Sequence, residues 1–461
     1  MPAHLECAMT EEKRENFSGK VGFVLAAAGS AVGLGNIWRF PYLAEEYGGG
    51  IFLLVYIVLV VTFGFALMLT EVSLGRRTGK SCIDAFKDLS KKHAFIGYLA
   101  ALVPIIIVPY YCVIGGWVTK YFAEFAIGSG STAAASGFFG SFISCGLPGV
   151  FDSPVTWFLI FSAMVILVVA FGVEKGVERV SKVLMPVLLV LMVIIAGYAL
   201  MLPGAGAGLE YYLMPDFSKF SMATVLGAMG QLFYSMSLAM GIMITYGSYM
   251  KKSVNIEKSV RQVSLVDTAV AILAGLMIVP SCIAFGSEIS SGPGLMFVTL
   301  PMVFESMPAG HLVGAVFFFL VIIAAMTSAI SLAETVVSMI RDRLKWNRTV
   351  ASVITMGLIF VLGILSCLGY GPLDWFTIIG MSFLDFSDFL SNSVLMPIVA
   401  ILTCLFIGYV VKTKFISDEI RSSGEFRFEP AYNVLVKYIC PILLIFILIT
   451  GLLSFFGVYQ I

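Results

Sequence analysis

Long apolar runs separated by short polar stretches fill almost the whole 461-residue chain. A helix that crosses the hydrocarbon core of a bilayer needs about 20 apolar residues, and most of the runs reach that length. Within lipid, a helix satisfies its own backbone hydrogen bonds, so the pattern predicts an all-α membrane protein with eleven transmembrane helices. The apolar runs lie at about 21–44, 51–74, 95–127, 154–172, 182–202, 222–249, 263–285, 312–340, 350–369, 383–411 and 435–457.

Composition excludes several classes of protein. Of all residues, 59% are hydrophobic and only 12% are charged, whereas soluble domains carry about 25% charged residues. The 28 basic and 28 acidic residues cancel, so no bulk charge favours nucleic acid, and the lipid bilayer is the expected partner. The cysteines and histidines are scattered singly, without the spacing of a disulfide framework or a zinc site. No nucleophile has an adjacent base at helical spacing, which argues against an enzyme.

The basic residues follow alternate loops. If the N-terminus is cytoplasmic, 25 of the 28 Lys and Arg residues fall on the cytoplasmic side, and only Arg39, Lys120 and Lys219 fall elsewhere. Cytoplasmic loops carry such an excess of basic residues. The pattern therefore predicts a multi-pass protein of the cell membrane with a cytoplasmic N-terminus and an extracellular C-terminus.

No stretch of polar sequence is long enough for a soluble domain. We expect a cytoplasmic N-terminal segment, two five-helix halves joined by an extracellular loop, a cytoplasmic loop, and an eleventh helix followed by an extracellular C-terminus. These segments are predicted at 1–20, 21–202, 203–221, 222–411, 412–434 and 435–461, with the two halves at 21–202 and 222–411.

Two of the predicted helices carry signs of interruption. The first contains three glycines at positions 29, 33 and 35, which do not form one helical face. An interrupted helix frees carbonyls that can bind a cation and amides that can bind an anion; a close-packing face is the alternative. The sixth helix has a weaker signal around Ser235 and Ser237, whose hydroxyls could simply bond to their own helix. Because helices 1 and 6 are five apart, a second copy would enter the membrane inverted, and paired broken helices indicate a site at the midplane.

Several acidic residues lie where charge is costly. They are Glu71, Asp267, Glu334, Asp385 and Asp388. Asp267 has no basic residue in its own helix, so a bound cation or a protonated structural carboxyl are the two interpretations. Hydroxyls at Thr327 and Ser328 would suit a hard cation.

The sequence closely resembles the neurotransmitter:sodium symporter family, which has the LeuT fold, and in particular its eleven-helix bacterial members. The most specific motif is GLGNIWRFP, from Gly33 to Pro41, followed in order by the segment from Gln231 to Gly241 and by Thr327-Ser328. The resemblance covers nearly the whole chain. It implies a 5+5 inverted repeat in which helices 1 and 6 are broken, and a protein of the bacterial inner membrane.

The resemblance also implies a set of site residues. The substrate site would consist of Ala31, Gly33, Gly35, Ile107, Tyr111, Tyr234, Ser235, Ser237, Met240, Ser328 and Leu332. A first sodium site would comprise Ala31, Asn36, Ser235 and Asp267, together with the carboxylate of the substrate. A second would comprise Gly29, Val32, Ala324, Thr327 and Ser328. Arg39 and Asp388, with Tyr234 between them, would close the outer path. Arg14 and Asp342, helped by Tyr249, would close the inner one, although ordinary salt bridges at the membrane surface are an alternative for these pairs.

The resemblance implies sodium-coupled import of a neutral hydrophobic or aromatic L-amino acid by alternating access. Monoamine-carrying relatives have an acidic residue at the position of Gly33, so this glycine favours an amino acid. The helix 6 break usually has a second glycine where this chain has Ala239. Because Ala271 occupies the position that is Glu in chloride-independent members and Ser in chloride-dependent ones, we expect Asp267 to supply the negative charge and transport to be independent of chloride. A membrane sensor that keeps the site without transport is the alternative function.

Overall fold

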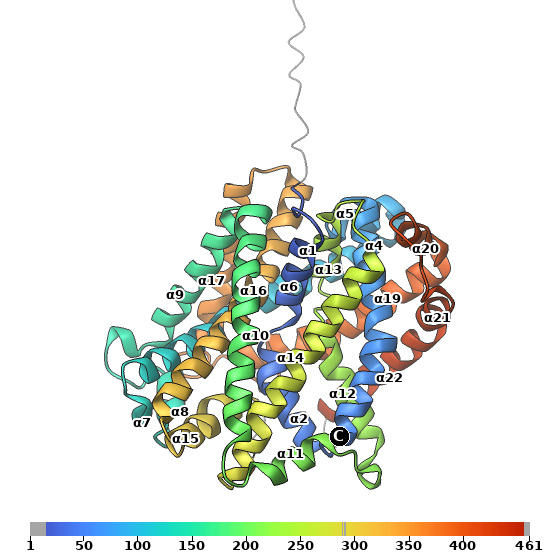
Figure 1. Cartoon of the computed structure of the whole chain (residues 1–461). Coiled ribbons are helices and arrows are strands. Elements are labelled where there is room, and N and C mark those ends of the chain that lie inside the picture. Colours follow the sequence, from blue (N-terminus) through green and yellow to red (C-terminus); the bar gives the residue numbers. More distant parts are fainter. Residues whose placement is uncertain (1–14, 288, 290–291, 456–461) are drawn as a thin grey trace, which may run out of the picture.

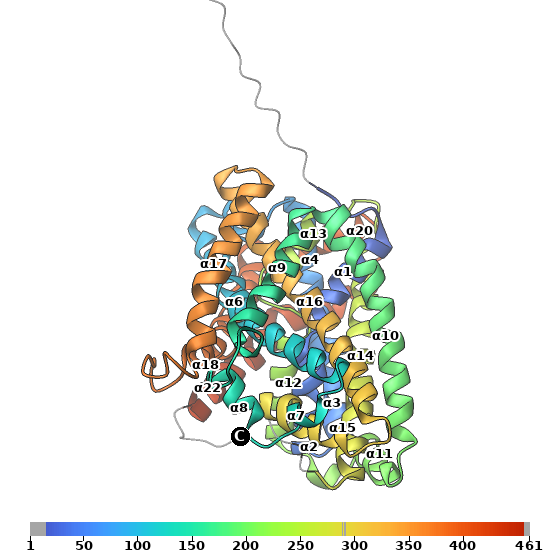
Figure 2. The ribbon, with the colours of Figure 1, turned by 90° about the vertical axis from the view of Figure 1, so that its left-hand side faces the viewer.

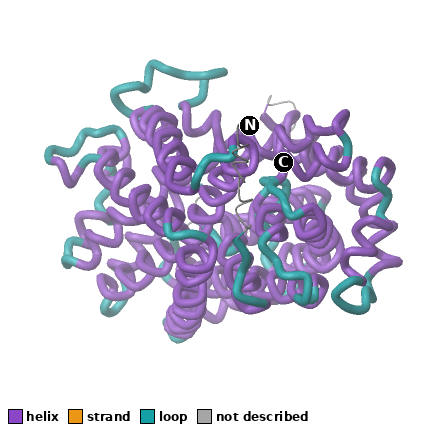
Figure 3. Tube along the Cα trace, turned by 90° about the horizontal axis from the view of Figure 1, so that it is seen from above, coloured by secondary structure: helices purple, strands orange, loops and turns teal. Residues whose placement is uncertain are grey.

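The computed structural model describes residues 15–287, 289 and 292–455. Within this part of the chain, the regular structure is entirely helical, as the view from above makes plain (Figure 3). Most of the helices run between two ends of the molecule (Figure 1). The described chain begins at the upper end of that view, whereas its last helix lies toward the lower end, and a quarter turn preserves this arrangement (Figure 2). Entry at one end and exit at the other agree with an odd number of crossings.

The first predicted half contains five helical segments, and short helices fill the loops between them. They are α1 (Lys20–Ala31) continued by η1 (Gly35–Arg39) and α2 (Phe40–Glu46); α3 (Gly50–Leu59), η2 (Val60–Gly64) and α4 (Phe65–Thr78); α5 (Cys82–Leu89), η3 (Lys91–His93) and α6 (Ala94–Ala126); α7 (Gly130–Ala133), α8 (Phe138–Ile143), η4 (Val150–Asp152) and α9 (Pro154–Ala170); and η5 (Val173–Glu178) with α10 (Arg179–Leu200).

The second predicted half and the C-terminal region repeat this scheme. Their helices are α11 (Ala205–Leu213), η6 (Phe217–Lys219), α12 (Met222–Ser235) and α13 (Ile242–Ser248); α14 (Ile256–Ala284); η7 (Leu295–Thr299), α15 (Leu300–Glu305) and α16 (Gly310–Leu344); α17 (Arg348–Leu368); α18 (Phe383–Asp388), η8 (Phe389–Leu395), α19 (Met396–Leu405) and η9 (Phe406–Val410); α20 (Lys414–Arg421); and α21 (Glu429–Val434), η10 (Leu435–Ile439) and α22 (Cys440–Phe455).

Every predicted apolar run coincides with a helical segment. Among the described residues, eight helices are long and apolar enough to span a membrane, or nine if α1 and the bent helix after it form one span. Two further runs fall below this criterion, because α9 has only 17 residues and α12 is separated from α13 by a break. The protein is therefore a multi-pass membrane protein, while the count of eleven spans stays a prediction.

Both predicted interruptions are present. Helix α1 ends at Ala31, and the helix that resumes at Gly35 is bent by 54° from it. The second break separates α12 from α13 over residues 236–241. In it, Ser237 and Ala239 have left-handed backbones, with φ of 52° and 60°. Such conformations cost side-chain-bearing residues about 1–3 kcal/mol each and persist only when their surroundings enforce them.

Two hydrogen bonds hold this strained segment. The buried Glu71 carboxylate accepts from the Ala239 amide at 2.7 Å, and the Ser237 hydroxyl donates to the Ser30 carbonyl at 2.9 Å. The first bond ties the break to α4, and the second ties it to the last turn of α1. Ala239 thus adopts a left-handed backbone conformation. The glycine that usually occupies this position would adopt it with less strain.

Helices α4 and α13 pack so closely that their glycines are required. A Cβ atom on Gly75 would lie 1.8 Å from the Ile244 carbonyl oxygen, and one on Gly247 would lie 2.2 Å from the Val72 carbonyl oxygen. Both neighbours are backbone atoms, which cannot move without shifting a helix. The inner half of the broken helix 6 is therefore fixed against α4.

We predict that Gly75→Ala lowers the thermal unfolding midpoint of the detergent-purified protein. The overpacking should cost about 1–3 kcal/mol, which outweighs the gain of about 1 kcal/mol that alanine brings within a helix. Gly357→Ala in α17 is the matched control, because a Cβ there has no neighbour within 4 Å. An unchanged or raised midpoint in Gly75→Ala would contradict the packing described.

Candidate functional site

The two breaks face each other and enclose a small buried cavity of about 30 Å³. Its lining includes ten of the eleven residues predicted for the substrate site, and it adds Ser30, Asn36 and Ile242. The remaining predicted residue, Ser235, faces Asp267 instead. The ten are Ala31, Gly33, Gly35, Ile107, Tyr111, Tyr234, Ser237, Met240, Ser328 and Leu332.

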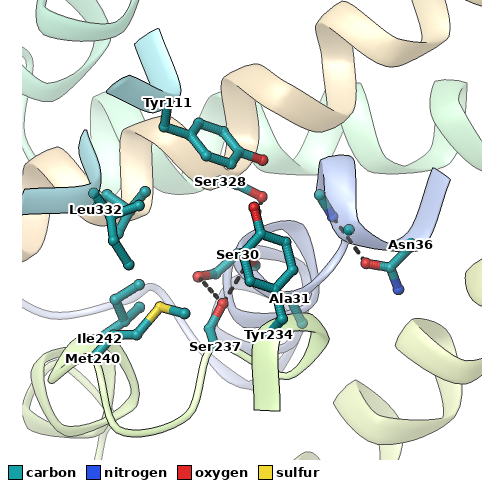
Figure 4. A pocket seen from close by; sticks show the side chains of 13 residues that line it. Ser30, Ala31, Asn36, Tyr111, Tyr234, Ser237, Met240, Ile242, Ser328 and Leu332 are labelled. Carbon is teal, nitrogen blue, oxygen red and sulfur yellow. Dashed lines mark hydrogen bonds between the residues drawn. The ribbon is translucent and has the colours of Figure 1, made fainter. Parts of the chain in front are cut away.

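The cavity has an apolar part and a polar part. Leu332, Met240 and Ile242 gather on one side, while the tyrosine and serine hydroxyls point toward the centre (Figure 4). Sequence reasoning missed Ile242, which begins α13 directly after the break and gives no local signal. It also left out Ser30, although that residue lies within the glycine-rich segment that predicted the break.

Glycine at positions 33 and 35 is a steric requirement. A Cβ atom on Gly33 would lie 2.7 Å from the Ser328 hydroxyl oxygen and 2.8 Å from the Tyr111 hydroxyl oxygen. A Cβ atom on Gly35 would lie 2.2 Å from the ring of Tyr234. The backbone of the break therefore lies directly against these side chains, and an acidic residue at position 33 would have to displace the Ser328 and Tyr111 hydroxyls.

Backbone polar groups of the break are turned toward side chains. The Leu34 amide donates to the Tyr111 hydroxyl at 3.1 Å, and the Gly33 amide donates to the Asn36 side-chain oxygen at 3.2 Å. The Gly35 carbonyl accepts from the Gln231 side chain at 2.9 Å. The unwound turn thus presents amides beside a phenolic hydroxyl, an arrangement suited to a carboxylate.

Asp267 is the centre of a buried polar cluster. Its side-chain oxygens accept from the Ser235 hydroxyl at 2.8 and 2.9 Å and from the Asn36 amide at 2.8 Å. Tyr56, which sequence reasoning missed, donates to the same carboxylate at 3.4 Å. Asp267 has no solvent exposure, and no basic side chain among the described residues forms an ion pair with it. A carboxylate in this setting fits a bound cation, because burial of an uncompensated charge is costly.

The residues predicted for the second sodium site also lie together. The Ser328 hydroxyl is 3.4 Å from the Gly29 carbonyl oxygen and 3.1 Å from the Val32 carbonyl oxygen. The Thr327 hydroxyl donates to the Ala324 carbonyl at 3.1 Å, and a Cβ on Gly29 would lie 3.2 Å from Thr327 Cβ. Carbonyl and hydroxyl oxygens of this kind are the ligands that hard cations prefer.

On the predicted outer side, the proposed gate residue Arg39 lies against Tyr234. The Arg39 guanidinium lies over the ring of Tyr234, 5.4 Å from its centroid. Asp388 accepts hydrogen bonds from Tyr110 at 3.1 Å and from Asn392 at 2.6 Å. Among the described residues, no ion pair joins Arg39 to Asp388. Tyr234 therefore separates the cavity from a larger hollow of about 270 Å³ that both Arg39 and Asn392 line.

On the predicted inner side lies a charge network that sequence reasoning did not foresee. Glu15 pairs with Arg341 at 2.8 Å and with Arg348 at 3.2 Å. Arg348 also pairs with the buried Glu334, which accepts from the Tyr249 hydroxyl at 2.8 Å. Tyr249, a predicted gate residue, takes part in this network through its bond to Glu334. The network ties the chain before α1 to α13, α16 and α17.

Of the two other residues predicted for the inner gate, the structure describes Asp342 but not Arg14. The Asp342 carboxylate accepts from the Ser81 amide at 2.7 Å.

The pKa of Glu15 is lowered, because the effect of burial, which opposes ionisation, is outweighed by Arg348, the Val173 amide and Arg341. A carboxyl with a depressed pKa loses its contribution only as pH falls through that pKa, so the Glu15 pairs persist at neutral pH.

The sequence is similar to known sodium-dependent transporters. The sequence matches the sodium:neurotransmitter symporter family over residues 14–128 and 146–460. It is 37% identical to the uncharacterized sodium-dependent transporter YhdH of Bacillus subtilis, over 97% of this chain and 100% of that protein. It is 26% identical to the human sodium- and chloride-dependent GABA transporter 2, over 92% of this chain and 77% of that protein.

A solved structure is also similar. The crystal structure of MhsT in complex with L-phenylalanine matches with a TM-score of 0.85 and 38% sequence identity. The match covers 95% of this chain and 100% of that chain.

We predict that Arg348→Met lowers the thermal unfolding midpoint strongly. Removing one partner of a buried pair leaves Glu334 uncompensated and should cost about 3–5 kcal/mol. The control is Arg427→Met, because Arg427 and Glu425 form a pair whose side chains are 80% and 72% exposed, and such pairs contribute about 0–1 kcal/mol. Equal midpoints for the two variants would show that the inner network does not stabilise this state.

Proposed function

Because the chain belongs to the sodium:neurotransmitter symporter family, we propose that it uses the sodium gradient to import a neutral hydrophobic or aromatic L-amino acid. The family is one of transporters rather than enzymes, and the relatives named as sodium-dependent support sodium coupling. The observation that carries the finer proposal is the buried Asp267 carboxylate, which lies beside the unwound turn and has no cationic partner in the described part of the chain.

We assign the first sodium site to Asp267, Asn36, Ser235 and the Ala31 carbonyl. The contacts of Asn36 and Ser235 with Asp267 support this assignment. The Asn36 side-chain oxygen accepts from the Gly33 amide, so cation binding through that oxygen requires the asparagine amide to change partners. We assign the second site to Gly29, Val32, Ala324, Thr327 and Ser328, whose oxygens lie together beside the same break.

The substrate is proposed from the two parts of the cavity. The amides near Gly33 and Gly35, together with the Tyr111 hydroxyl, would hold an α-carboxylate, and the carbonyls of Ala31, Tyr234 and Ser237 would hold the amino group. The apolar side, with Met240, Ile242 and Leu332, suits a large hydrophobic side chain, and the flexible Met240 can adapt to its shape. The bound L-phenylalanine in the similar MhsT structure supports this substrate class.

Coupling follows if the substrate carboxylate completes the first sodium site. Sodium and amino acid then raise each other's affinity by the same factor, as linkage requires. In this proposal the ion pairs among Glu15, Arg348 and Glu334 hold the inner side closed, and their release opens the path to the cytoplasm. We place the two inverted five-helix repeats at 21–202 and 222–411, with the N-terminus cytoplasmic and the C-terminus extracellular.

Chloride independence is proposed from the same carboxylate. The hydroxyls of Tyr56 and Ser235 both reach Asp267, and Ala271, one turn later on α14, brings no charge or hydroxyl. The Asp267 carboxylate already accepts hydrogen bonds from Tyr56 and Ser235, so these donors do not need a chloride ion. A chloride ion at this place would also be repelled by the negative charge of Asp267. The human relative named as chloride-dependent is only 26% identical.

The transport proposal is tested with the full chain in proteoliposomes. An inward sodium gradient should drive accumulation of radiolabelled L-phenylalanine, and an equal potassium gradient should not. Sodium-dependent phenylalanine binding without accumulation would identify a sensor instead. Neither binding nor uptake of any hydrophobic amino acid would overturn the substrate class.

We predict that replacing chloride by gluconate on both sides leaves the initial rate of sodium-driven uptake unchanged. The physical reason is that Asp267 already supplies the negative charge beside Tyr56. Replacing sodium by choline in the same preparation is the positive control and should abolish uptake. A rate that falls with chloride concentration would refute the role given to Asp267.

A further inference from the structure

A groove on the outside of the protein, away from the transport cavity, has a volume of about 430 Å³. Its walls come from α3, η2 and α4 on one side and from α14 on the other, and the loop before α21 closes one end. Ile57, Val61 and Leu265 form its apolar walls, with the side chains of Val61 and Leu265 exposed by 59% and 68%. In a membrane-spanning chain, such exposed apolar walls face lipid.

Two arginines stand in this groove. Arg261 lies on α14 and is exposed, and it forms no hydrogen bond or ion pair with any described residue. Arg427 comes from the loop, and its one ion pair with a described residue is with Glu425, at 2.9 Å, where both side chains are largely exposed. Such an exposed pair is weak, so the Arg427 guanidinium can exchange Glu425 for another anion.

The groove also holds one acidic residue and one unsatisfied hydroxyl. The Glu257 carboxylate accepts from the Arg427 amide at 3.0 Å and thereby fixes the loop that carries the arginine. With Glu257 counted, the lining still has a net positive charge. The Ser264 hydroxyl is buried and has no hydrogen-bond partner among the described residues, although it lines the groove. A polar ligand group would satisfy it.

We take the first residue of α14 as the level of the bilayer surface, which puts Arg261 at the depth of a lipid headgroup. Arg261 is five residues into α14, which begins at Ile256, so it stands about 7–8 Å from the start of that helix. The polar zone on each face of a bilayer is about 5–8 Å thick. Thr268 is two turns further along α14, and the apolar walls continue to it. The groove therefore runs from headgroup level into the hydrocarbon.

We propose that this groove binds a phospholipid with an anionic headgroup, from the leaflet on the N-terminal side of the protein. Arg261 and Arg427 hold the phosphate and the headgroup, and the first part of one acyl chain lies between Val61 and Leu265. Basic pockets between transmembrane helices recognise anionic lipids in this way. The groove lies on the back of the helices that carry Tyr56 and Asp267, and its assignment is independent of the transported substrate.

The test is native mass spectrometry of the purified full-length protein with added phosphatidylglycerol or phosphatidylcholine of identical acyl chains. The wild-type protein should retain phosphatidylglycerol in preference to phosphatidylcholine. Because each basic residue near a lipid surface contributes about fivefold in affinity, the double variant Arg261→Gln/Arg427→Gln should lose roughly 25-fold. Equal retention of the two lipids by the wild-type protein overturns the proposal without any variant.

Two further variants separate the alternatives. The variant Lys175→Gln/Arg179→Gln removes two exposed basic residues outside the groove and should keep the preference for phosphatidylglycerol. If this variant loses as much affinity as the groove variant, overall charge explains the preference and the proposed site is wrong. Leu265→Trp, which fills the apolar wall, should weaken phosphatidylglycerol binding while both arginines remain. If glycerophosphoglycerol, which lacks acyl chains, competes as well as the intact lipid, the arginines bind free phosphate groups and the lipid site is wrong.

Discussion

The buried carboxylate of Asp267 is the group on which the rest of the site depends. Transfer of an ionised carboxylate from water into a protein interior costs several kcal/mol even after relaxation. Hydrogen bonds from Asn36, Ser235 and Tyr56 offset part of this cost, but no basic side chain among the described residues neutralises it. Because these donors come from helix 1, helix 6 and helix 2, the carboxylate joins elements that are far apart in sequence.

The broken helices make this arrangement accessible to small ligands. An intact helix 1 would use the carbonyls of Gly29 and Val32 for its own hydrogen bonds, whereas the break turns them toward Ser328. The break in helix 6 keeps Ala239 in a left-handed conformation, and Glu71 holds it there. The strained backbone conformations therefore lie where the proposed ions and substrate bind. The packing of the surrounding helices holds these conformations in place.

The sequence predicted most of the fold because its signals are local. Apolar runs mark the helices, and Gly33 and Gly35 mark the first break, where the structure leaves no space for a side chain. The inner network was not predictable in this way, since Glu15 meets Arg348 across 333 positions and no pattern indicates which of many charged residues meet. Tyr56 was missed for a different reason, because an aromatic residue in an apolar run ordinarily belongs to the core. Whether Arg39 contacts Asp388 directly or lies over Tyr234 depends on the relative position of the helices, which residue types alone do not determine.

The most direct test of the role of Asp267 is the equilibrium binding of L-phenylalanine to the purified protein over a range of sodium concentrations, for wild type and Asp267→Asn. In the wild type, phenylalanine affinity should rise with sodium, and sodium affinity should rise with phenylalanine by the same factor. The variant, with its unfolding midpoint measured in parallel to verify folding, should lose most of this mutual dependence. A folded variant with the same sodium dependence as the wild type would contradict the account.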